Sequence, residues 1–152
     1  MKVIQGDLIQ LALEGKFDVI VHGCNCFCAM EAGIAKSIKC VFPEAYTVDC
    51  ETKVGDREKL GSFSSVSVCR KNHTITVVNA YTQYHWSSDV RQVDYEALRL
   101  VFYKIKSEFS GLLIGYPKIG AGLAGGDWHI ILKIIDEELA GEDHCLVVRS
   151  SE

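Results

Sequence analysis

The sequence predicts an α/β layered fold built on a mixed β-sheet. Short apolar runs alternate along the chain with segments whose apolar residues recur at helical spacing. Two neighbouring runs, Ser62–Cys69 and Thr74–Val78, flank the turn-forming stretch Lys71-Asn72-His73 and indicate a β-hairpin. Because a hairpin joins antiparallel strands, the sheet is not expected to be purely parallel.

The other elements follow from the same periodicities. Apolar runs predict strands at Lys2–Gln5, Phe17–Val21, Leu112–Ile114 and Cys145–Val148. Helical spacing predicts a short amphipathic turn at Leu8–Leu13 and helices at Ile34–Val41, Glu44–Thr52, Tyr95–Phe109 and Trp128–Leu139. The run Val19-Ile20-Val21 has no polar alternation, which indicates a strand buried on both faces.

Size and charge restrict the classes of function. The 152 residues fit one domain, 1–152, and 48% of them are apolar, as in ordinary globular proteins. The net charge is −4 without a cluster of Lys and Arg, so no nucleic-acid-binding patch is expected. The amino end, MKVIQGDLIQ, lacks the pattern of a secretion signal, and no run is long enough for a membrane span. Seven cysteines then indicate reduced thiols and a cytoplasmic location.

Cys24, Cys26 and Cys28 alternate in the stretch HGCNCFC. The chain has neither a CxxC nor an HxxxH knuckle, and cysteines at every second position of an extended segment point to one face. No arginine stands six places after any cysteine, as a cysteine-phosphatase loop requires. A dyad of Cys24 with His22 stays open, but buried packing is the favoured interpretation. We expect no metal ion and no cofactor.

Two glycine-rich loops each lie between a predicted strand and a predicted helix. The first runs from Gly23 to Gly33, and the second is GYPKIGAGLAGG, Gly115–Gly126. Glycine lets the backbone approach a ligand, and helix N-termini favour anions, so two such loops can clamp a diphosphate. Tight strand-to-helix connections are the alternative reading. The letters of GxGxxG at Gly120–Gly125 match a nicotinamide fingerprint only weakly, since no acidic residue follows at the required distance.

These residues together resemble the macro domain family. The resemblance rests on Gly6-Asp7-Leu8, VIVHGCN, Ala32–Ala35 and PKIGAGLAGGDW, in order over essentially the whole chain. It implies a three-layer α/β/α fold with a mixed, roughly six-stranded sheet and an ADP-ribose cleft at its crest.

The resemblance also implies a set of binding residues. Asp7, with the N–H of Leu8 beside it, would take the adenine amino group, and Asn25 would approach the terminal ribose. The diphosphate and terminal ribose would lie between two loops, made of Gly33, Ile34 and Ala35, and of Ile119, Gly120, Ala121, Gly122, Leu123, Ala124 and Gly125. Asp7 as a helix cap and Asn25 as a turn former are the alternatives.

Catalysis is less clearly marked. Macro hydrolases acting on acidic side chains carry an aspartate where this chain has Ala35, and the terminal ADP-ribose glycohydrolases carry a lysine and an aspartate where it has Gln83 and Ala124. The remaining candidates are His22, which titrates near neutrality, and Asp127 at the start of a helix. The alternative for His22 is a strand-end histidine hydrogen-bonded to the backbone. The alternative for Asp127 is the N-cap of its helix.

Three functions therefore stay open. The HGCNC stretch resembles the small macro domains that process ADP-ribose 1″-phosphate, which favours a phosphatase with His22 as acid or base. An ADP-ribosyl hydrolase acting on a modified protein or nucleic acid is the second, and a non-catalytic ADP-ribose reader is the third. The expected partners are ADP-ribose, its 1″-phosphate or an ADP-ribosylated macromolecule, and no membrane. Tyr81, Tyr84 and Trp86 are candidates for covering the ligand.

Overall fold

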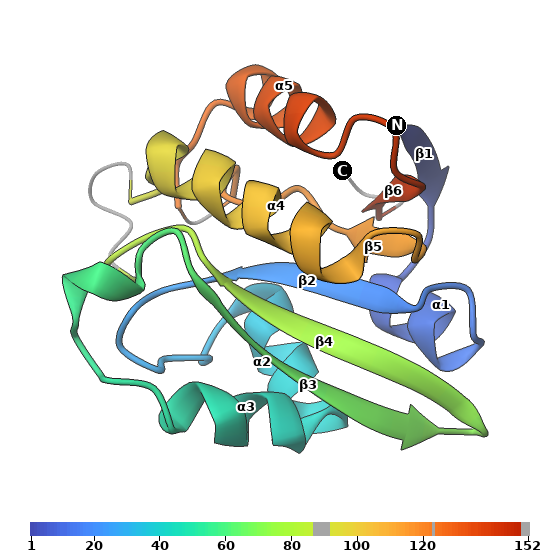
Figure 1. Cartoon of the computed structure of the whole chain (residues 1–152). Helices are drawn as coiled ribbons and strands as arrows, with labels where there is room; N and C mark the ends of the chain where they lie inside the picture. Colours follow the sequence, from blue (N-terminus) through green and yellow to red (C-terminus); the bar gives the residue numbers. More distant parts are fainter. Residues whose placement is uncertain (87–91, 123, 150–152) are drawn as a thin grey trace.

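A six-stranded mixed sheet forms the centre of the computed structural model, which describes residues 1–86, 92–122 and 124–149 (Figure 1). Its strands are β1 (Lys2–Gln5), β2 (Val19–Cys24), β3 (Phe63–Arg70), β4 (His73–Tyr81), β5 (Ile114–Tyr116) and β6 (His144–Val148). They lie in the order β1-β6-β5-β2-β4-β3, and all neighbours are parallel except the β3–β4 hairpin. The mixed sheet and its hairpin are confirmed.

Helices cover both faces of the sheet, which gives the expected three layers (Figure 1). The helices are α1 (Leu8–Leu13), α2 (Gly33–Val41), α3 (Pro43–Cys50), α4 (Tyr95–Phe109) and α5 (Trp128–Glu138), with a short 3-10 helix at Arg57–Lys59. The α4 and α5 helices lie on one face, and α1, α2 and α3 on the other. Within the described ranges, none of these helices is long and apolar enough to cross a bilayer.

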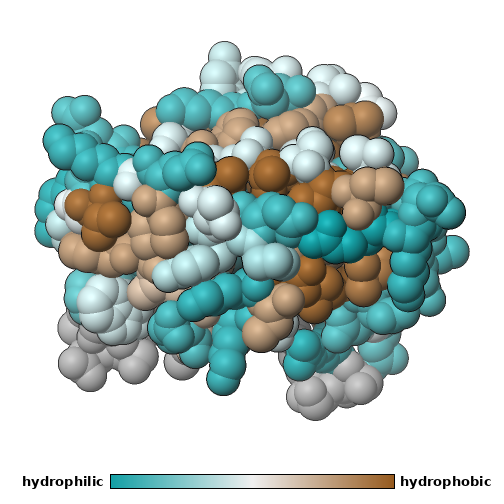
Figure 2. All heavy atoms as spheres, turned by 90° about the horizontal axis from the view of Figure 1, so that it is seen from below, coloured by the Kyte–Doolittle hydropathy of each residue, from teal (hydrophilic) through white to brown (hydrophobic). Residues whose placement is uncertain are grey.

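Strand β2 joins the two cores because its side chains alternate between the faces. Val19 and Val21 pack with α4 and α5, whereas Ile20 packs with α1 and α2. All three are fully buried, as the unbroken apolar run predicts. Seen from below, on the side of α3, the surface is largely hydrophilic with smaller apolar patches (Figure 2).

Three strands depart from their predicted bounds by two residues or more: β4 ends at Tyr81 rather than Val78, and the other two are β2 and β5. Strand β2 begins at Val19 rather than Phe17, and β5 covers Ile114–Tyr116 rather than Leu112–Ile114. The reason for the shift of β2 and β5 is a hydrogen bond of the Asp18 side chain, whose Oδ2 accepts from the N–H of Leu113. This bond fixes the segments just before β2 and β5. The pairing of these two strands therefore starts later in the chain than predicted, and both strands end closer to the loops that follow them.

Candidate functional site

A cavity of about 940 Å³ lies at the carboxyl ends of the parallel strands. Segments following β1, β2, β4, β5 and β6 all contribute to its wall. Because parallel strands end at one edge of a sheet, residues distant in sequence meet there, as in other open α/β folds. We call this cavity the cleft.

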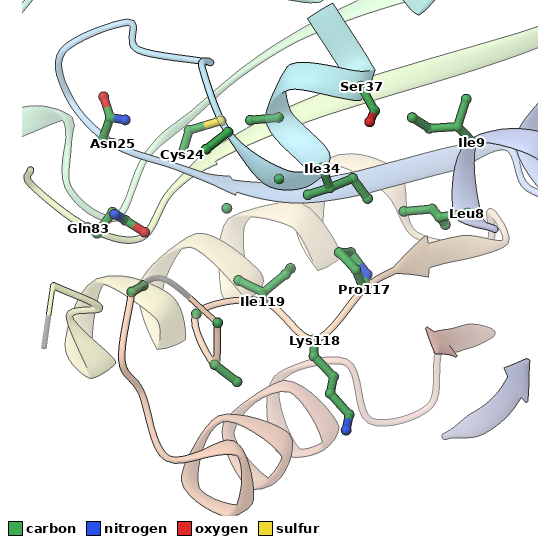
Figure 3. Close-up of a pocket in the computed structure, with 18 of the residues that line it drawn as sticks. Leu8, Ile9, Cys24, Asn25, Ile34, Ser37, Gln83, Pro117, Lys118 and Ile119 are labelled. Carbon is green, nitrogen blue, oxygen red and sulfur yellow. The ribbon is translucent and has the colours of Figure 1, made fainter. Parts of the chain in front are cut away.

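One end of the cleft is apolar with a carboxylate at its rim. The slot is formed by Leu8, Ile9, Ile34, Pro117 and Val147 (Figure 3). Asp7 lies beside it and caps α1, because its Oδ1 accepts a hydrogen bond of 3.0 Å from the N–H of Gln10. Its Oδ2 lies 3.7 Å from Nη2 of Arg149. Asp7 therefore caps the helix with one oxygen and presents the other to solvent and the cleft.

Asn25 lines the opposite end and organises the loop between β2 and α2. Its Oδ1 accepts hydrogen bonds from the N–H groups of Phe27, at 2.9 Å, and Ala29, at 3.3 Å. Its Nδ2 donates to the carbonyl of Ala29 at 2.9 Å. The turn-forming role is thus present in the structure, and the second hydrogen of Nδ2 has no partner within the described ranges.

Backbone N–H groups without partners face the cleft between these ends. Helix α2 begins at Gly33, with a φ of +59°, and its N-cap Ala32 supplies no side-chain acceptor. Its first N–H groups are therefore available to an anion. In the second loop, Gly120 has a φ of +75°, and the N–H groups of Gly120 and Gly122 bond to no other residue that the structure describes.

Most of the predicted binding residues line the cleft. Those that do are Asp7, Leu8, Asn25, Gly33, Ile34, Ala35, Ile119, Gly120, Ala121, Gly122 and Ala124. Gly125 does not line the cleft, and its N–H donates instead to the carbonyl of Gly122 within the same loop. Leu123 lies outside the described residues. The sequence thus predicted the composition of the cleft wall, and the binding roles of these residues stay proposals.

His22 does not reach the cleft, so its predicted place beside the terminal ribose is wrong. Its side chain is fully buried, and its Nε2 lies 2.7 Å from Oδ1 of Asn79, the residue opposite it on β4. Burial lowers the pKa of His22 to about 4, although the hydrogen bond to Asn79 acts in the opposite direction. The ring is neutral at pH 7 and serves the core as a strand histidine.

Asp127 is likewise a structural residue. Its Oδ1 accepts a hydrogen bond of 2.9 Å from the N–H of His129 and so caps α5. Its own N–H donates to the hydroxyl of Tyr95 at 2.9 Å, and the residue does not line the cleft. The catalytic prediction for Asp127 is therefore not supported, and the alternative of an N-cap is confirmed.

The three alternating cysteines do not share a face. Cys24 ends β2 and lines the cleft, Cys26 points its Sγ to the carbonyl of Gln83, and Cys28 points its Sγ to the carbonyl of Asp49. The segment leaves the extended conformation, and Cys28 has a φ of +58°. Among the described residues, no three His, Cys, Asp or Glu side chains converge as metal ligands. Burial raises the pKa of the Cys24 thiol, so the thiol is protonated at neutral pH, and its Sγ lies 3.5 Å from Nε2 of the buried His22.

Several cleft residues were not predicted from the sequence. They include Glu31, Ser37, Lys118 and Arg149. Lys118 and Arg149 closely follow β5 and β6, so their positions just after predicted strands could have indicated that they line the cleft. Of the three aromatic candidates only Trp86 lines the cleft, stacked on His85 at 3.8 Å; Tyr81 is buried and donates to Asp49.

The chain is similar to proteins of known sequence and structure. An uncharacterized 17.5 kDa protein of Enterobacteria phage T4, from the tk–vs intergenic region, is 36% identical over 141 residues, covering 90% of this chain and 88% of that protein. No family model matches the sequence.

Solved structures have a similar fold. The macrodomain of Mycobacterium tuberculosis DarG has a TM-score of 0.73 at 21% identity, over 97% of this chain and 98% of that one. Thermosipho africanus DarTG, in complex with ADP-ribose, has a TM-score of 0.73 at 16% identity, over all of this chain and 43% of that one.

Proposed function

We propose that this chain, which has the fold of the macrodomains, is a member of the macro domain family and binds ADP-ribose or a derivative of it in the cleft. The observation that carries the proposal is the pair of loops with unpartnered N–H groups, at Gly33 and at Gly120 and Gly122, on two sides of one cavity. Such groups are suited to a diphosphate. The related DarTG was solved with ADP-ribose, which supports the choice of ligand.

The two ends of the cleft suit the two ends of this ligand. The apolar slot beside Leu8 and Val147 accommodates a flat base, and the Oδ2 of Asp7, which the helix cap does not use, is an acceptor for an exocyclic amine. At the other end, the amide of Asn25 supplies a donor for the hydroxyls of a ribose. The cavity of about 940 Å³ is within the range of sites for ligands of this size.

The finer proposal is that the chain dephosphorylates ADP-ribose 1″-phosphate. The free N–H groups at the start of α2 suit a terminal phosphate as well as the diphosphate. With His22 and Asp127 outside the cleft, the candidate base among the described residues is Glu31, which lines the cleft after the loop of Asn25 and lies 3.3 Å from Nζ of Lys39. In this scheme Glu31 takes a proton from a water that attacks phosphorus. The bond from phosphorus to the oxygen on C1″ breaks with its electron pair going to that oxygen, the oxygen takes the proton back from Glu31, and ADP-ribose and inorganic phosphate leave.

The alternatives differ in what the cleft does after binding. A reader binds ADP-ribose and releases it unchanged. A hydrolase removes ADP-ribose from a protein or nucleic acid, and for that reaction Gln83 on the cleft wall offers an amide, which is neither a nucleophile nor a base. This absence of a base at Gln83 favours the phosphatase or the reader.

One experiment with two measurements tests the proposal. Calorimetry should show ADP-ribose binding and much weaker binding of AMP, which lacks the second phosphate and the terminal ribose. Phosphate release from ADP-ribose 1″-phosphate should then fall about 10²–10⁴-fold in Glu31→Gln, as expected when a positioned base is lost. Glu108→Gln, on the exposed side of α4, is the matched control.

The results separate the three functions. Equal affinity for AMP and ADP-ribose would contradict the diphosphate clamp and with it the proposed ligand. Binding without phosphate release would leave the reader. Release that is unchanged in Glu31→Gln would remove Glu31 from the reaction.

A further inference from the structure

We infer that the base end of the cleft holds a third phosphate, on the 2′-oxygen of the adenosine ribose. The ligand class is then 2′-phosphorylated ADP-ribose, the ADP-ribose unit of a 2′-phosphorylated dinucleotide. This inference rests on the proposed function and concerns the same cleft. Its basis is a pair of cations, Lys118 and Arg149, that the diphosphate loops do not use.

Lys118 lies between the base slot and the diphosphate loop. Pro117 is part of the slot beside Leu8, and Gly120 begins the glycine loop, so the segment from Pro117 to Ile119 connects the two subsites (Figure 3). A ribose that joins a base in the slot to a phosphate at Gly120 passes over this segment. The Nζ of Lys118 makes no hydrogen bond or ion pair with any residue in the described part of the chain, and it is free to meet an anion there.

Arg149 lies at the end of the neighbouring strand. Tyr116 on β5 pairs with Leu146 on β6. Two residues further along each chain segment come Lys118 and Val148, and Arg149 follows Val148. Adjacent strands are about 4.8 Å apart, which brings the two backbones together at the crest. The side chain of Arg149 is 60% exposed, and its ion pair with Asp7 is long at 3.7 Å.

The two cations approach the crest from opposite faces. Val147 packs against α1 and α2, and Arg149, two residues on, points to the same side and meets Asp7. Tyr116 packs against α4 and α5, and Lys118, two residues on, is directed to that side, away from Leu8 and Ile34 (Figure 3). To meet an anion above the ends of β5 and β6 together with Arg149, the Lys118 side chain must turn toward the base slot, which its lack of a partner among the described residues allows.

The local charge favours a phosphate over a neutral hydroxyl. Among the described residues that line the cleft, the charged ones are Lys118, Arg149, Asp7 and Glu31; Glu31 follows the loop of Asn25, so two positive charges and one negative charge remain for the base end. Asp7 Oδ1 is already engaged by the N–H of Gln10, and a guanidinium can keep its contact with Oδ2 while other N–H groups hold a phosphate. Arginine close to a ribose 2′-oxygen is the usual device for accepting a 2′-phosphate in dinucleotide sites.

The test compares ligands that differ by one phosphate. Calorimetry with the full chain measures the affinity for ADP-ribose and for 2′-phospho-ADP-ribose, and the 2′-phosphate should tighten binding about tenfold or more, as charge-assisted hydrogen bonds do. In Lys118→Gln and in Arg149→Gln the ratio of the two affinities should fall toward one. Lys104→Gln, on the exposed side of α4, is the control and should keep the ratio of the parent.

A second comparison checks the position of the phosphate. Adenosine 2′,5′-bisphosphate should compete better than adenosine 3′,5′-bisphosphate for the cleft, and the advantage should shrink as salt is added. ADP-ribose binding with no gain from the 2′-phosphate would overturn this inference and leave the proposed function intact. An equal gain from a 3′-phosphate would overturn the assignment to the 2′-oxygen. If neither form of ADP-ribose binds, the proposed function itself is wrong.

Discussion

Single residues at the crest of this sheet serve structure and site together. Asp7 illustrates this, because one carboxylate oxygen caps α1 and the other faces the cleft near Arg149. From the sequence, a cap and an adenine acceptor were competing interpretations of the same residue. The geometry makes both possible at once, since a carboxylate has two oxygens and a cap uses one of them.

Substitution can separate the two roles of Asp7. Asparagine is as good an N-cap as aspartate, so Asp7→Asn should leave the melting temperature nearly unchanged. The loss of the charged acceptor should weaken ADP-ribose binding by about 1–3 kcal/mol. Asp7→Ala should weaken binding similarly and also cost about 1 kcal/mol of stability through the lost cap. Calorimetry and thermal unfolding of the three proteins give the comparison.

Asp56 provides the control for this prediction. It also caps a short helix, because its Oδ1 accepts a hydrogen bond from the N–H of Glu58, but it does not line the cleft. Asp56→Asn should bind ADP-ribose like the parent. An Asp7→Asn protein with the parent's affinity would show that Asp7 is a cap only.

At the scale of elements, the connection from strand to loop to helix places the groups of the site. Glycine-rich stretches predicted both loops, since glycine marks where a backbone turns sharply or approaches a ligand. The two glycines of the second loop differ in their task. A side chain on Gly120 would meet Val93 Cγ2 at 2.8 Å and would occupy a backbone with a φ of +75°, whereas a side chain on Gly122 would meet nothing within 4 Å.

This difference predicts opposite effects for the two alanine variants. Gly120→Ala should destabilise the fold by about 1–3 kcal/mol, because of the left-handed backbone and the contact with Val93. Gly122→Ala should leave stability unchanged and still weaken ADP-ribose, because the added methyl group stands where the ligand meets the backbone. Chemical denaturation and calorimetry measure the two effects. A Gly122→Ala protein with unchanged affinity would place the diphosphate elsewhere.

At the scale of the whole molecule, periodicity was sufficient to predict the layers and the sheet. The apolar face of α4 reports burial directly, and this helix has its predicted bounds, whereas the apolar run of β2 predicted the burial of Val19–Val21 but not the bounds of the strand. The point at which a strand ends is less clear from a single sequence, and β2 continues three residues past its predicted end at Val21, so His22 lies inside the ladder. His22 was therefore assigned to the cleft, although the register of β2 with β4 places it against Asn79 in the core.

The cleft shows the same limit. Glycines and Asp7 were found because their residue types are unusual for plain connections. Lys118 and Arg149 were missed, because isolated cations are common on any surface and only the pairing of β5 with β6 places the segments that follow these two strands at one cleft. Cys24, Cys26 and Cys28 separate for a related reason: the chain turns after Asn25, and alternation in sequence no longer means one face.

The burial of His22 predicts how the stability of the whole fold depends on pH. Its pKa is lowered from 6.5 to about 4 in the folded state, so between these values the unfolded chain binds more protons than the native chain. The free energy of unfolding should therefore be highest above pH 6.5 and fall as the pH decreases toward 4, by about 3 kcal/mol for this residue. The pKa of His144 is lowered mainly by burial and contributes in the same direction.

Chemical denaturation between pH 7 and pH 4.5 tests this prediction. In His22→Gln the slope of stability against pH should be clearly reduced, because the residue that must take up a proton is gone, and stability at pH 7 should be lower because the buried pairing with Asn79 is altered. The ADP-ribose affinity at pH 7 should change little, since the ring does not line the cleft. His129→Gln, at the exposed start of α5, should keep the parent's slope. A His22→Gln protein with the parent's pH dependence, or one that folds normally but loses binding, would contradict the structural role of His22.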